Sequence, residues 1–206
     1  MGDGEDFFDA IYTLTEPHET AAHYARFASR YETAMAENGY VTPARCAAAL
    51  AEIGADFGVP VLDLGCGSGL SGMALHTEGF QTIDGTDFSE EMLALAREKG
   101  IYRDLWQADL SQPAQDRAAS YMAIVAAGVL NPAHVPAEAI DHILEMLQPG
   151  GLFVFSLNDH AIAAGGYNGR LNNHIDGGQV ELLKRDYGEH MPGQGLKAFV
   201  YALRKR

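Results

Sequence analysis

The sequence is short of cysteine and of long apolar runs, and each scarcity argues against a class of protein. Its two cysteines, Cys46 and Cys66, fall in a predicted helix and in a glycine-rich turn, which argues against a disulfide framework. No stretch approaches the ~18 apolar residues that a membrane span needs, and the first residues lack a basic and then apolar leader pattern. These features predict a cytoplasmic protein.

Basic residues are also scarce. Lysine and arginine total 14 against 28 aspartate and glutamate, which gives a formal charge of −14. Because such a field repels nucleic acid and anionic membranes, we expect neither as a partner, and we expect a small neutral or cationic substrate. An acidic balance that only keeps the protein in solution would explain the same composition.

Short apolar runs alternate with helical patterns through most of the chain, an order that is typical of a parallel sheet covered by helices. From residue 158 to 178 the sequence is rich in glycine, asparagine and alanine, and two further runs then predict a closing antiparallel hairpin. The predicted strands are 59–64, 81–85, 102–107, 121–127, 152–157, 180–186 and 196–203. The predicted helices are 70–78, 89–99 with Ser89 as its N-cap, and one that begins at Pro136, has Ile140, Ile143, Leu144 and Leu147 on one face and stops at residues 148–151.

The first quarter of the chain has a helical pattern. Tyr24, Phe27 and Tyr31 recur at helical spacing, and a further helix over 44–53 opens with Thr42 and Pro43. We therefore predict an N-terminal helical cap over residues 1–56 and a ligand-binding core over 57–206, forming one compact unit.

The most informative run joins a buried-type strand to a glycine-rich turn. Gly65, Gly67 and Gly69 follow the strand and let the backbone turn tightly against a ligand. Asp63, just before the turn, suits a cationic group, while amides at the start of the next helix suit an anionic one. A zwitterionic amino-acid tail fits this pair better than a pyrophosphate does.

Three acids stand at or just beyond the ends of successive predicted strands, at the edge where a parallel sheet binds its ligand: Asp63, Asp87 and Asp109. Asp87 has the spacing of an acid that binds ribose hydroxyls. Asp109 is placed to accept a hydrogen bond from an exocyclic amine such as that of adenine, with Leu110 or Phe88 against the ring. Each acid alone would also suit a solvated loop, so the prediction depends on the series.

The run from Asp63 to Gly69, with Asp87 and Asp109 behind it, resembles the nucleotide-binding core of the class I S-adenosylmethionine-dependent methyltransferases, over roughly 59–157. The N-terminal segment, from Tyr24 and Tyr31 to Cys46, resembles the Williams–Beuren syndrome region methyltransferase-like proteins. This resemblance implies a Rossmann-like α/β fold whose seven-stranded, mostly parallel sheet ends in an antiparallel hairpin. One departure is Met122, which stands where many relatives have an acidic residue.

The resemblance also implies S-adenosylmethionine as methyl donor, with S-adenosylhomocysteine as product, a small-molecule acceptor and no metal. The residues expected to contact the donor are Tyr31, Asp63, Gly65, Cys66, Gly67, Gly69, Asp87, Phe88, Met92, Ala108, Asp109, Leu110 and Ala126.

Methyl transfer from a sulfonium needs little acid–base help, so the catalytic residues stay open. His134 and His160, which follow predicted strands, and Tyr31 are the candidates, and each histidine also suits a solvated loop. Two other functions remain as alternatives: a protein that binds the donor without turnover, and a nicotinamide-dependent oxidoreductase, since residues 67–72 satisfy G-x-G-x-x-G. Asp63, beside the turn, would repel the pyrophosphate of a nicotinamide cofactor.

Overall fold

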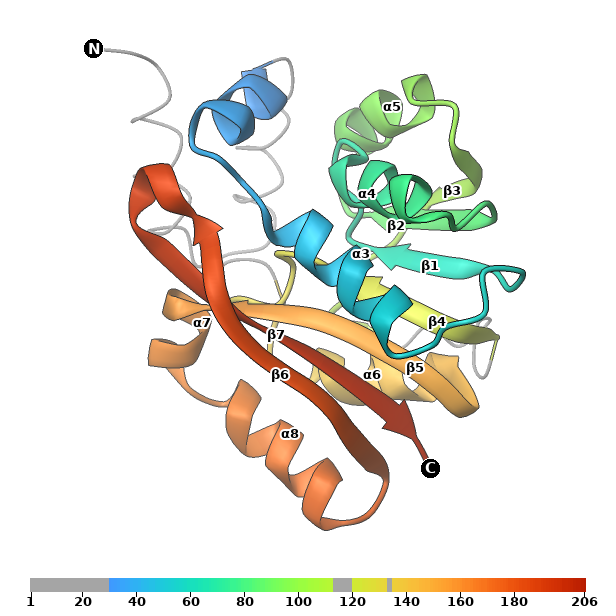
Figure 1. The fold of residues 1–206 in the computed structure, drawn as a ribbon, viewed down its shortest axis with the longest axis vertical. Coiled ribbons are helices and arrows are strands. Elements are labelled where there is room, and N and C mark those ends of the chain that lie inside the picture. Colours follow the sequence, from blue (N-terminus) through green and yellow to red (C-terminus); the bar gives the residue numbers. More distant parts are fainter. Residues whose placement is uncertain (1–29, 113–119, 133–134) are drawn as a thin grey trace.

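The computed structural model describes residues 30–112, 120–132 and 135–206. Seven strands form one sheet in the order β3-β2-β1-β4-β5-β7-β6 (Figure 1). Neighbours among β1 to β5 are parallel, whereas β7 is antiparallel to both β5 and β6. The predicted fold is confirmed. The strands are β1 Val61–Leu64, β2 Ile83–Asp87, β3 Tyr102–Gln107, β4 Tyr121–Ala126, β5 Leu147–Asn158, β6 Val180–Met191 and β7 Leu196–Lys205.

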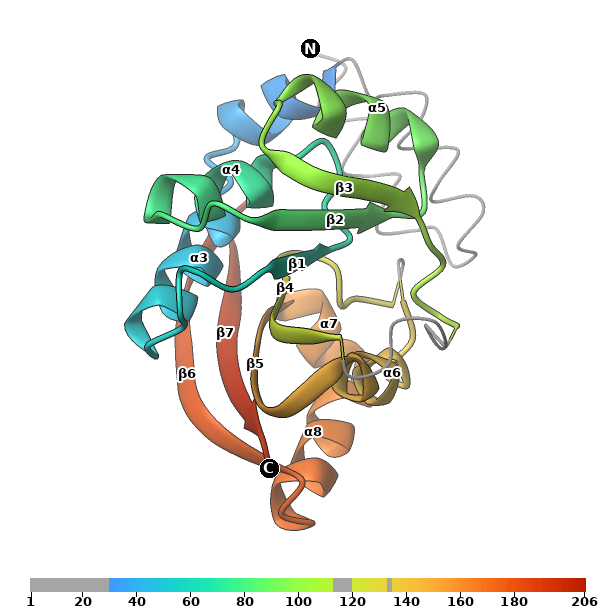
Figure 2. The ribbon, with the colours of Figure 1, turned by 90° about the vertical axis from the view of Figure 1, so that its right-hand side faces the viewer.

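Helices cover both faces of this sheet, with α3 and α4 on one side and α6 and α8 on the other (Figure 2). Each face has its own apolar cluster, and β1 and β4 contribute to both, which is why their sequences are almost wholly apolar. The helices are α3 Thr42–Glu52, α4 Leu70–Glu78, α5 Glu90–Glu98, α6 Ala139–Met146, α7 Asp159–Ala164 and α8 Tyr167–Asp176, with a short 3₁₀ turn, η2, at Pro192–Gln194.

The elements that flank the ligand edge form where the sequence predicts them. Helix α4 has the predicted bounds, and Ser89 caps α5, its Oγ accepting a hydrogen bond from the Met92 amide at 3.2 Å. Strand β2 ends at Asp87, two residues beyond the predicted end, because it pairs with β3 up to Gln107. The carboxyl ends of β1 and β2 therefore lie side by side.

The end of the fourth predicted helix is placed wrongly. Helix α6 stops at Met146, and Leu147 begins β5, where it pairs with Tyr121. The register of β5 against β4 then shifts, and Gly150 adopts φ +80° within the irregular stretch. Proline and glycine, which usually stop a helix, here form an irregular extension at the start of a strand.

Two short helices occupy the glycine-rich region where composition indicated no element. The Asn158 side chain accepts a hydrogen bond from the Ala161 amide at 3.0 Å and so caps α7. Gly165 and Gly166, both with positive φ, separate α7 from α8, which buries Tyr167 and Leu171 in the core. Tertiary burial stabilises these helices despite their low helix propensity.

The N-terminal part is described from residue 30. Residues 30–37 are helical, α3 confirms the helix that opens at Thr42 and Pro43, and Tyr24 lies outside the described residues. Helix α3 packs on α4 and on the sheet, with Cys46, Ala47 and Leu50 in the core. The division into a cap and a core stays a prediction. No helix within the described ranges is both long and apolar enough to cross a membrane.

Candidate functional site

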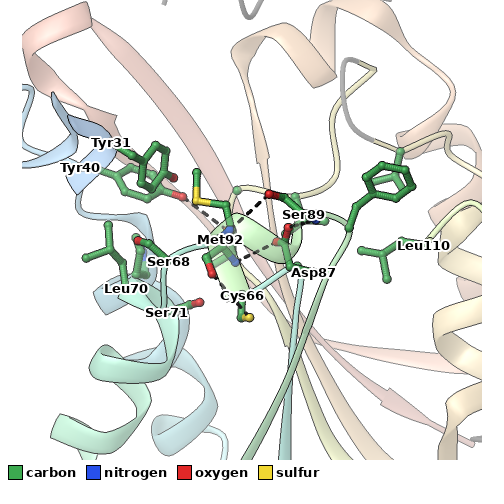
Figure 3. A pocket seen from close by; sticks show the side chains of 18 of the residues that line it. Tyr31, Tyr40, Cys66, Ser68, Leu70, Ser71, Asp87, Ser89, Met92 and Leu110 are labelled. Carbon is green, nitrogen blue, oxygen red and sulfur yellow. Dashed lines mark hydrogen bonds between the residues drawn. The ribbon is translucent and has the colours of Figure 1, made fainter. Parts of the chain in front are cut away.

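A cavity opens at the carboxyl ends of β1, β2 and β4 and has about 910 Å³ of space between the atoms that surround it, part of it open to solvent. This is the edge at which open parallel sheets bind ligands. Figure 3 shows side chains converging on it from both sides. Its lining comprises Tyr31, Tyr40, Pro43, Gly65, Cys66, Gly67, Ser68, Leu70, Ser71, Asp87, Phe88, Ser89, Met92, Asp109, Leu110, Ala127, Gly128, Val129 and Val135.

The glycine turn forms the floor of the cavity, and its backbone requires glycine. Gly65, Gly67 and Gly69 all have positive φ. A Cβ on Gly65 would lie 2.6 Å from a methyl carbon of Val129, so no side chain fits between the turn and the segment after β4. At Gly67 the same position has no atom within 4 Å, and a ligand can approach the backbone there.

Asp87 links the turn to the next strand. One carboxylate oxygen accepts a hydrogen bond from the Gly67 amide at 2.9 Å, and the other accepts one from the Ser89 amide at 2.9 Å. Burial raises the pKa of this carboxyl, and those amide hydrogen bonds oppose the rise. The structure thus brings Asp87 to the cavity wall in an orientation that its own backbone neighbours determine.

Asp63 lies beneath the turn, and its side chain does not line the cavity. It is fully buried, and its Oδ2 accepts hydrogen bonds from the hydroxyls of Ser71 and Tyr102, each at 2.7 Å. Gly72, in the first turn of α4, leaves room for Tyr102, whose hydroxyl would lie 2.2 Å from a Cβ there. Burial raises the Asp63 pKa to about 6. Asp63 braces the turn, and its contact with a cationic group stays a prediction.

The two ends of the cavity differ in character. Leu110 lies at one end and the side chains of Tyr31, Tyr40 and Leu70 at the other, with Asp87 between them (Figure 3). Asp109 also lines the cavity and is exposed, its Oδ1 accepting a hydrogen bond from the Ser111 amide at 2.9 Å. One end is therefore polar and acidic beside apolar Leu110, and the other is aromatic and apolar.

Residues 61–151 match a family described as "Methyltransferase domain". These residues belong to a methyltransferase domain. It is 32% identical over 132 residues to human methyltransferase-like protein 27, over 63% of this chain and 54% of that protein. It is 29% identical over 146 residues to ubiquinone biosynthesis O-methyltransferase of Escherichia coli O157:H7, over 68% of this chain and 60% of that protein.

Residues 61–151 thus form a methyltransferase domain, while the chain matches only 54% and 60% of the length of these two relatives. A TehB-like S-adenosylmethionine-dependent methyltransferase from Corynebacterium glutamicum has the same fold, with a TM-score of 0.65, 23% identity and coverage of 90% of this chain and 99% of that one. A methyltransferase domain of this fold implies S-adenosylmethionine as the cofactor.

The methyltransferase cavity suits this donor. The Ser68 hydroxyl, on the turn that lines the cavity, is buried and has no hydrogen-bond partner within the described structure, so a ligand would satisfy it. Asp87 and the open space above Gly67 add an acceptor and a close backbone approach.

Most residues expected to contact the donor meet at this cavity. Four of them do not line it, although three of these lie directly beside residues that do: Gly69 caps α4 after the turn, the Ala108 amide donates to the Asp87 carbonyl at 3.0 Å, and Ala126 ends β4. Asp63 is the fourth. The residues that line it as expected are Tyr31, Gly65, Cys66, Gly67, Asp87, Phe88, Met92, Asp109 and Leu110.

Other lining residues lacked a clear signal in the sequence. Val129 and Val135 follow β4 and reach the cavity because the chain folds back over the glycine turn. Tyr40 and Pro43 precede the sheet, and only contacts with the distant hairpin bring them to it. The dipeptide Thr42-Pro43, which signals a helix start, was the one local indication of where this segment turns toward the cavity.

The catalytic candidates fare differently from the binding residues. His160 is exposed on α7 and does not line the cavity, and His134 lies outside the described residues. Tyr31 does line it.

Burial raises the pKa of the Cys66 thiol, so this cysteine stays protonated at neutral pH. Among the described residues, no histidine, lysine or arginine lines the cavity, and no group of acids, cysteines and histidines is arranged to hold a metal ion.

Proposed function

We propose that this protein transfers a methyl group from S-adenosylmethionine to a small-molecule acceptor. The observation that carries the proposal is the single cavity wall in which the glycine turn, Asp87 and Asp109 stand in chain order along one edge of the sheet. That order matches the parts of the donor: amino-acid tail, ribose and base. The chain's similarity to an O-methyltransferase of ubiquinone biosynthesis supports a small-molecule acceptor.

The residues of the turn would hold the donor. Asp87, Asp109, Phe88 and Leu110 line the same cavity. We expect the Asp87 carboxylate to accept hydrogen bonds from ribose hydroxyls and Asp109 to accept one from an exocyclic amine, with Phe88 and Leu110 against the ring. When bound, S-adenosylmethionine supplies a methyl group on a cationic sulfur that leaves as a neutral thioether. The protein's contribution is then to hold the acceptor's nucleophilic atom in line with that carbon.

No base is needed for an acceptor that loses its proton to water after or during transfer. This fits a cavity whose lining, among the described residues, includes no histidine, lysine or arginine. The same lining is what a protein that binds the donor without turnover would show. Binding and turnover are therefore measured separately.

Calorimetry with S-adenosylhomocysteine and with NAD is the first test. We expect micromolar affinity for the former and none for the latter, because the acids at this edge repel a pyrophosphate. The reverse result would overturn the proposal.

Incubation with methyl-labelled S-adenosylmethionine and an extract of cellular metabolites is the second test, and transfer of label to a small molecule is expected. Tight binding with no transfer would identify a binding protein without turnover.

We also propose that the protein works in the cytoplasm, without nucleic-acid or membrane partners. Cys46 and Cys66 are both buried free thiols, which suits a reducing compartment. The charge of −14 disfavours a polyanionic partner. Fractionation of cells that express the tagged protein from its own promoter would test the location.

A further inference from the structure

The end of the cavity opposite Leu110 is walled by three uncharged side chains, which we call the tyrosine wall: Tyr31, Tyr40 and Leu70 (Figure 3). The two carboxylates that line the cavity, Asp87 and Asp109, are assigned to the donor's ribose and base. Within residues 30–112, 120–132 and 135–206, no cationic side chain reaches this lining. The wall thus offers ring faces and hydroxyls, and it offers nothing to neutralise a charge.

The segment that carries Tyr40 and Pro43 is fastened to the C-terminal hairpin. The Val41 amide donates to the His190 carbonyl at 3.1 Å, and the Gly193 amide donates to the Asn38 carbonyl at 3.0 Å. The Arg45 guanidinium donates to the backbone carbonyls of Glu189, Asp186 and Ala198 at 2.7, 3.0 and 3.1 Å. Strands β6 and β7 therefore fix where this segment meets the cavity.

His190 fixes the Tyr40 ring itself. Its side chain is buried, with its Nδ1 2.7 Å from the Thr42 hydroxyl oxygen, and the Tyr40 ring stands edge-on to it with the ring centres 5.2 Å apart. On the other side, the Tyr40 hydroxyl donates to the Ala127 carbonyl at 3.4 Å, and it occupies the place of a Cβ on Gly128. Tyr40 is thus held between the hairpin and the end of β4.

We propose that the tyrosine wall is the subsite of the methyl acceptor, and that the acceptor is an uncharged molecule with an apolar or aromatic body. This inference rests on the proposed methyl transfer, because it places the donor's reactive end beside the glycine turn. An anionic acceptor would lose its hydration without gaining a partner. A cationic one would stand next to the donor's positive sulfur with no carboxylate assigned to it. His190 acts as a positioning residue, through Tyr40.

Packing alone is the competing explanation. Tyr31, Tyr40 and Leu70 pack against a small buried cluster formed by Ala34, Met35 and Met191, and such packing would occur without any acceptor. The two explanations differ in what the wall does to substrate choice and to acceptor affinity.

Charge separation of a metabolite extract tests the substrate class. The extract is divided by ion exchange at pH 7 into cationic, uncharged and anionic pools, and each pool is incubated with the protein and methyl-labelled S-adenosylmethionine. We expect label in the uncharged pool. Label mainly in the anionic or the cationic pool would overturn this inference while leaving methyl transfer intact. Label in no pool, with S-adenosylhomocysteine bound, would count against turnover itself.

Variants of the wall test its location. Tyr40→Ala should raise about tenfold the concentration of the uncharged pool that gives half the maximal rate. His190→Gln should act in the same direction, and Tyr40→Phe, which keeps the ring and loses only the hydroxyl, should raise this concentration by less than Tyr40→Ala does. The affinity for S-adenosylhomocysteine should change by no more than about twofold in all three. An equal loss of donor affinity would show that Tyr40 serves the donor, and an unchanged half-maximal concentration would leave packing as the explanation.

Tyr187→Ala is the matched control, because Tyr187 lies on the same hairpin, is 48% exposed and does not line the cavity. We expect it to leave both quantities unchanged. Binding of S-adenosylhomocysteine also reports whether each variant is folded. If Tyr40→Ala fails that check, Tyr40→Leu, which fills more of the space, takes its place, and the same expected results and the same contrary results apply to it.

Discussion

The glycine-turn end of the cavity joins residues that are close in the chain, whereas the tyrosine wall joins residues that are far apart. Asp87 accepts from Gly67, 20 positions away, while His190 contacts Thr42, 148 positions away. A buried ionisable side chain supports each end: Asp63 lies beneath the turn and His190 behind the wall. The first end is built by one strand-turn-helix unit and its neighbour, and the second only by closure of the whole sheet.

Asp63 and His190 also respond to pH in opposite ways. Burial raises the Asp63 pKa from 3.8 to about 6 and lowers the His190 pKa from 6.5 to about 4. Both shifts favour the uncharged form. Because one group is an acid and the other a base, the stabilities that they confer change with opposite slopes over almost the same range.

The largest expected effect concerns the rigidity of the turn. Gly65→Ala adds a Cβ at φ +68°, 2.6 Å from the stiff side chain of Val129. Left-handed strain and overlap together should cost about 4 kcal/mol of unfolding free energy. Gly150→Ala has φ +80° and no atom within 4 Å, so it should cost only the strain, about 1 to 2 kcal/mol. Urea denaturation of both variants measures the difference, and equal costs would contradict the overlap.

His190 should give the next largest effect. A pKa below its unfolded value means that the folded state binds fewer protons, so stability is lost as pH falls from about 6.5 to 4. Each tenfold change in proton affinity corresponds to about 1.4 kcal/mol, so the loss of unfolding free energy is about 3 kcal/mol. The difference in unfolding free energy between His190→Gln and the original protein should therefore shift by this amount between pH 7 and 4. If this difference does not change with pH, His190 has the same pKa in the folded and unfolded states.

Asp63 should show the opposite slope, slightly smaller. Its raised pKa means that the folded state holds the proton more tightly, so stability is present below pH 3.8 and lost as pH rises through about 6. Relative to the original protein, Asp63→Asn should gain about 2 to 3 kcal/mol of unfolding free energy between pH 4 and 7. Denaturation with the ligand absent is the measurement. A difference that does not change with pH would contradict the raised pKa of Asp63.

The next prediction concerns Asp87, which lines the cavity, and its effect on the affinity for the donor. Asp87→Ala should weaken binding of S-adenosylhomocysteine by about 1 to 3 kcal/mol, since ribose hydroxyls lose their acceptor and the Gly67 amide loses its partner. Calorimetry would detect this, with Asp176→Ala as the control. An unchanged dissociation constant would remove Asp87 from the donor site.

The smallest effect should arise where the two ends meet. Gly128→Ala places a Cβ 2.1 Å from the Tyr40 hydroxyl, which is the movable end of a side chain, so the ring should turn aside. With φ at +75°, backbone strain should lower the free energy of unfolding by about 1 to 2 kcal/mol, well below the loss expected for Gly65→Ala. Urea denaturation compares the two. A cost as large as that of Gly65→Ala would mean that Tyr40 is held too firmly to move.

Local pattern explains which predictions succeeded. The glycine turn, the Ser89 cap and the bounds of α4 depend on residues within a few positions of one another, and all were predictable. The stop after α6 was wrong because Leu147 gains more by pairing with Tyr121 than by continuing a helix face. Helices α7 and α8 formed where composition gave no signal, because Tyr167 and Leu171 find an apolar face to cover.

The sequence by itself determined the fold class and the glycine-turn end of the cavity. A strand, a tight turn and a helix bring Gly65 and Gly67 to one edge, and an acid at the end of the next strand reaches the same place through the geometry of parallel pairing. Only the tertiary structure decided that Asp63 lies below the cavity and that Tyr40 walls it. The position of Asp63 depends on which side chains the complete sheet buries, and that of Tyr40 on contacts with a hairpin at the C-terminal end of the chain. No short-range spacing in the sequence encodes either.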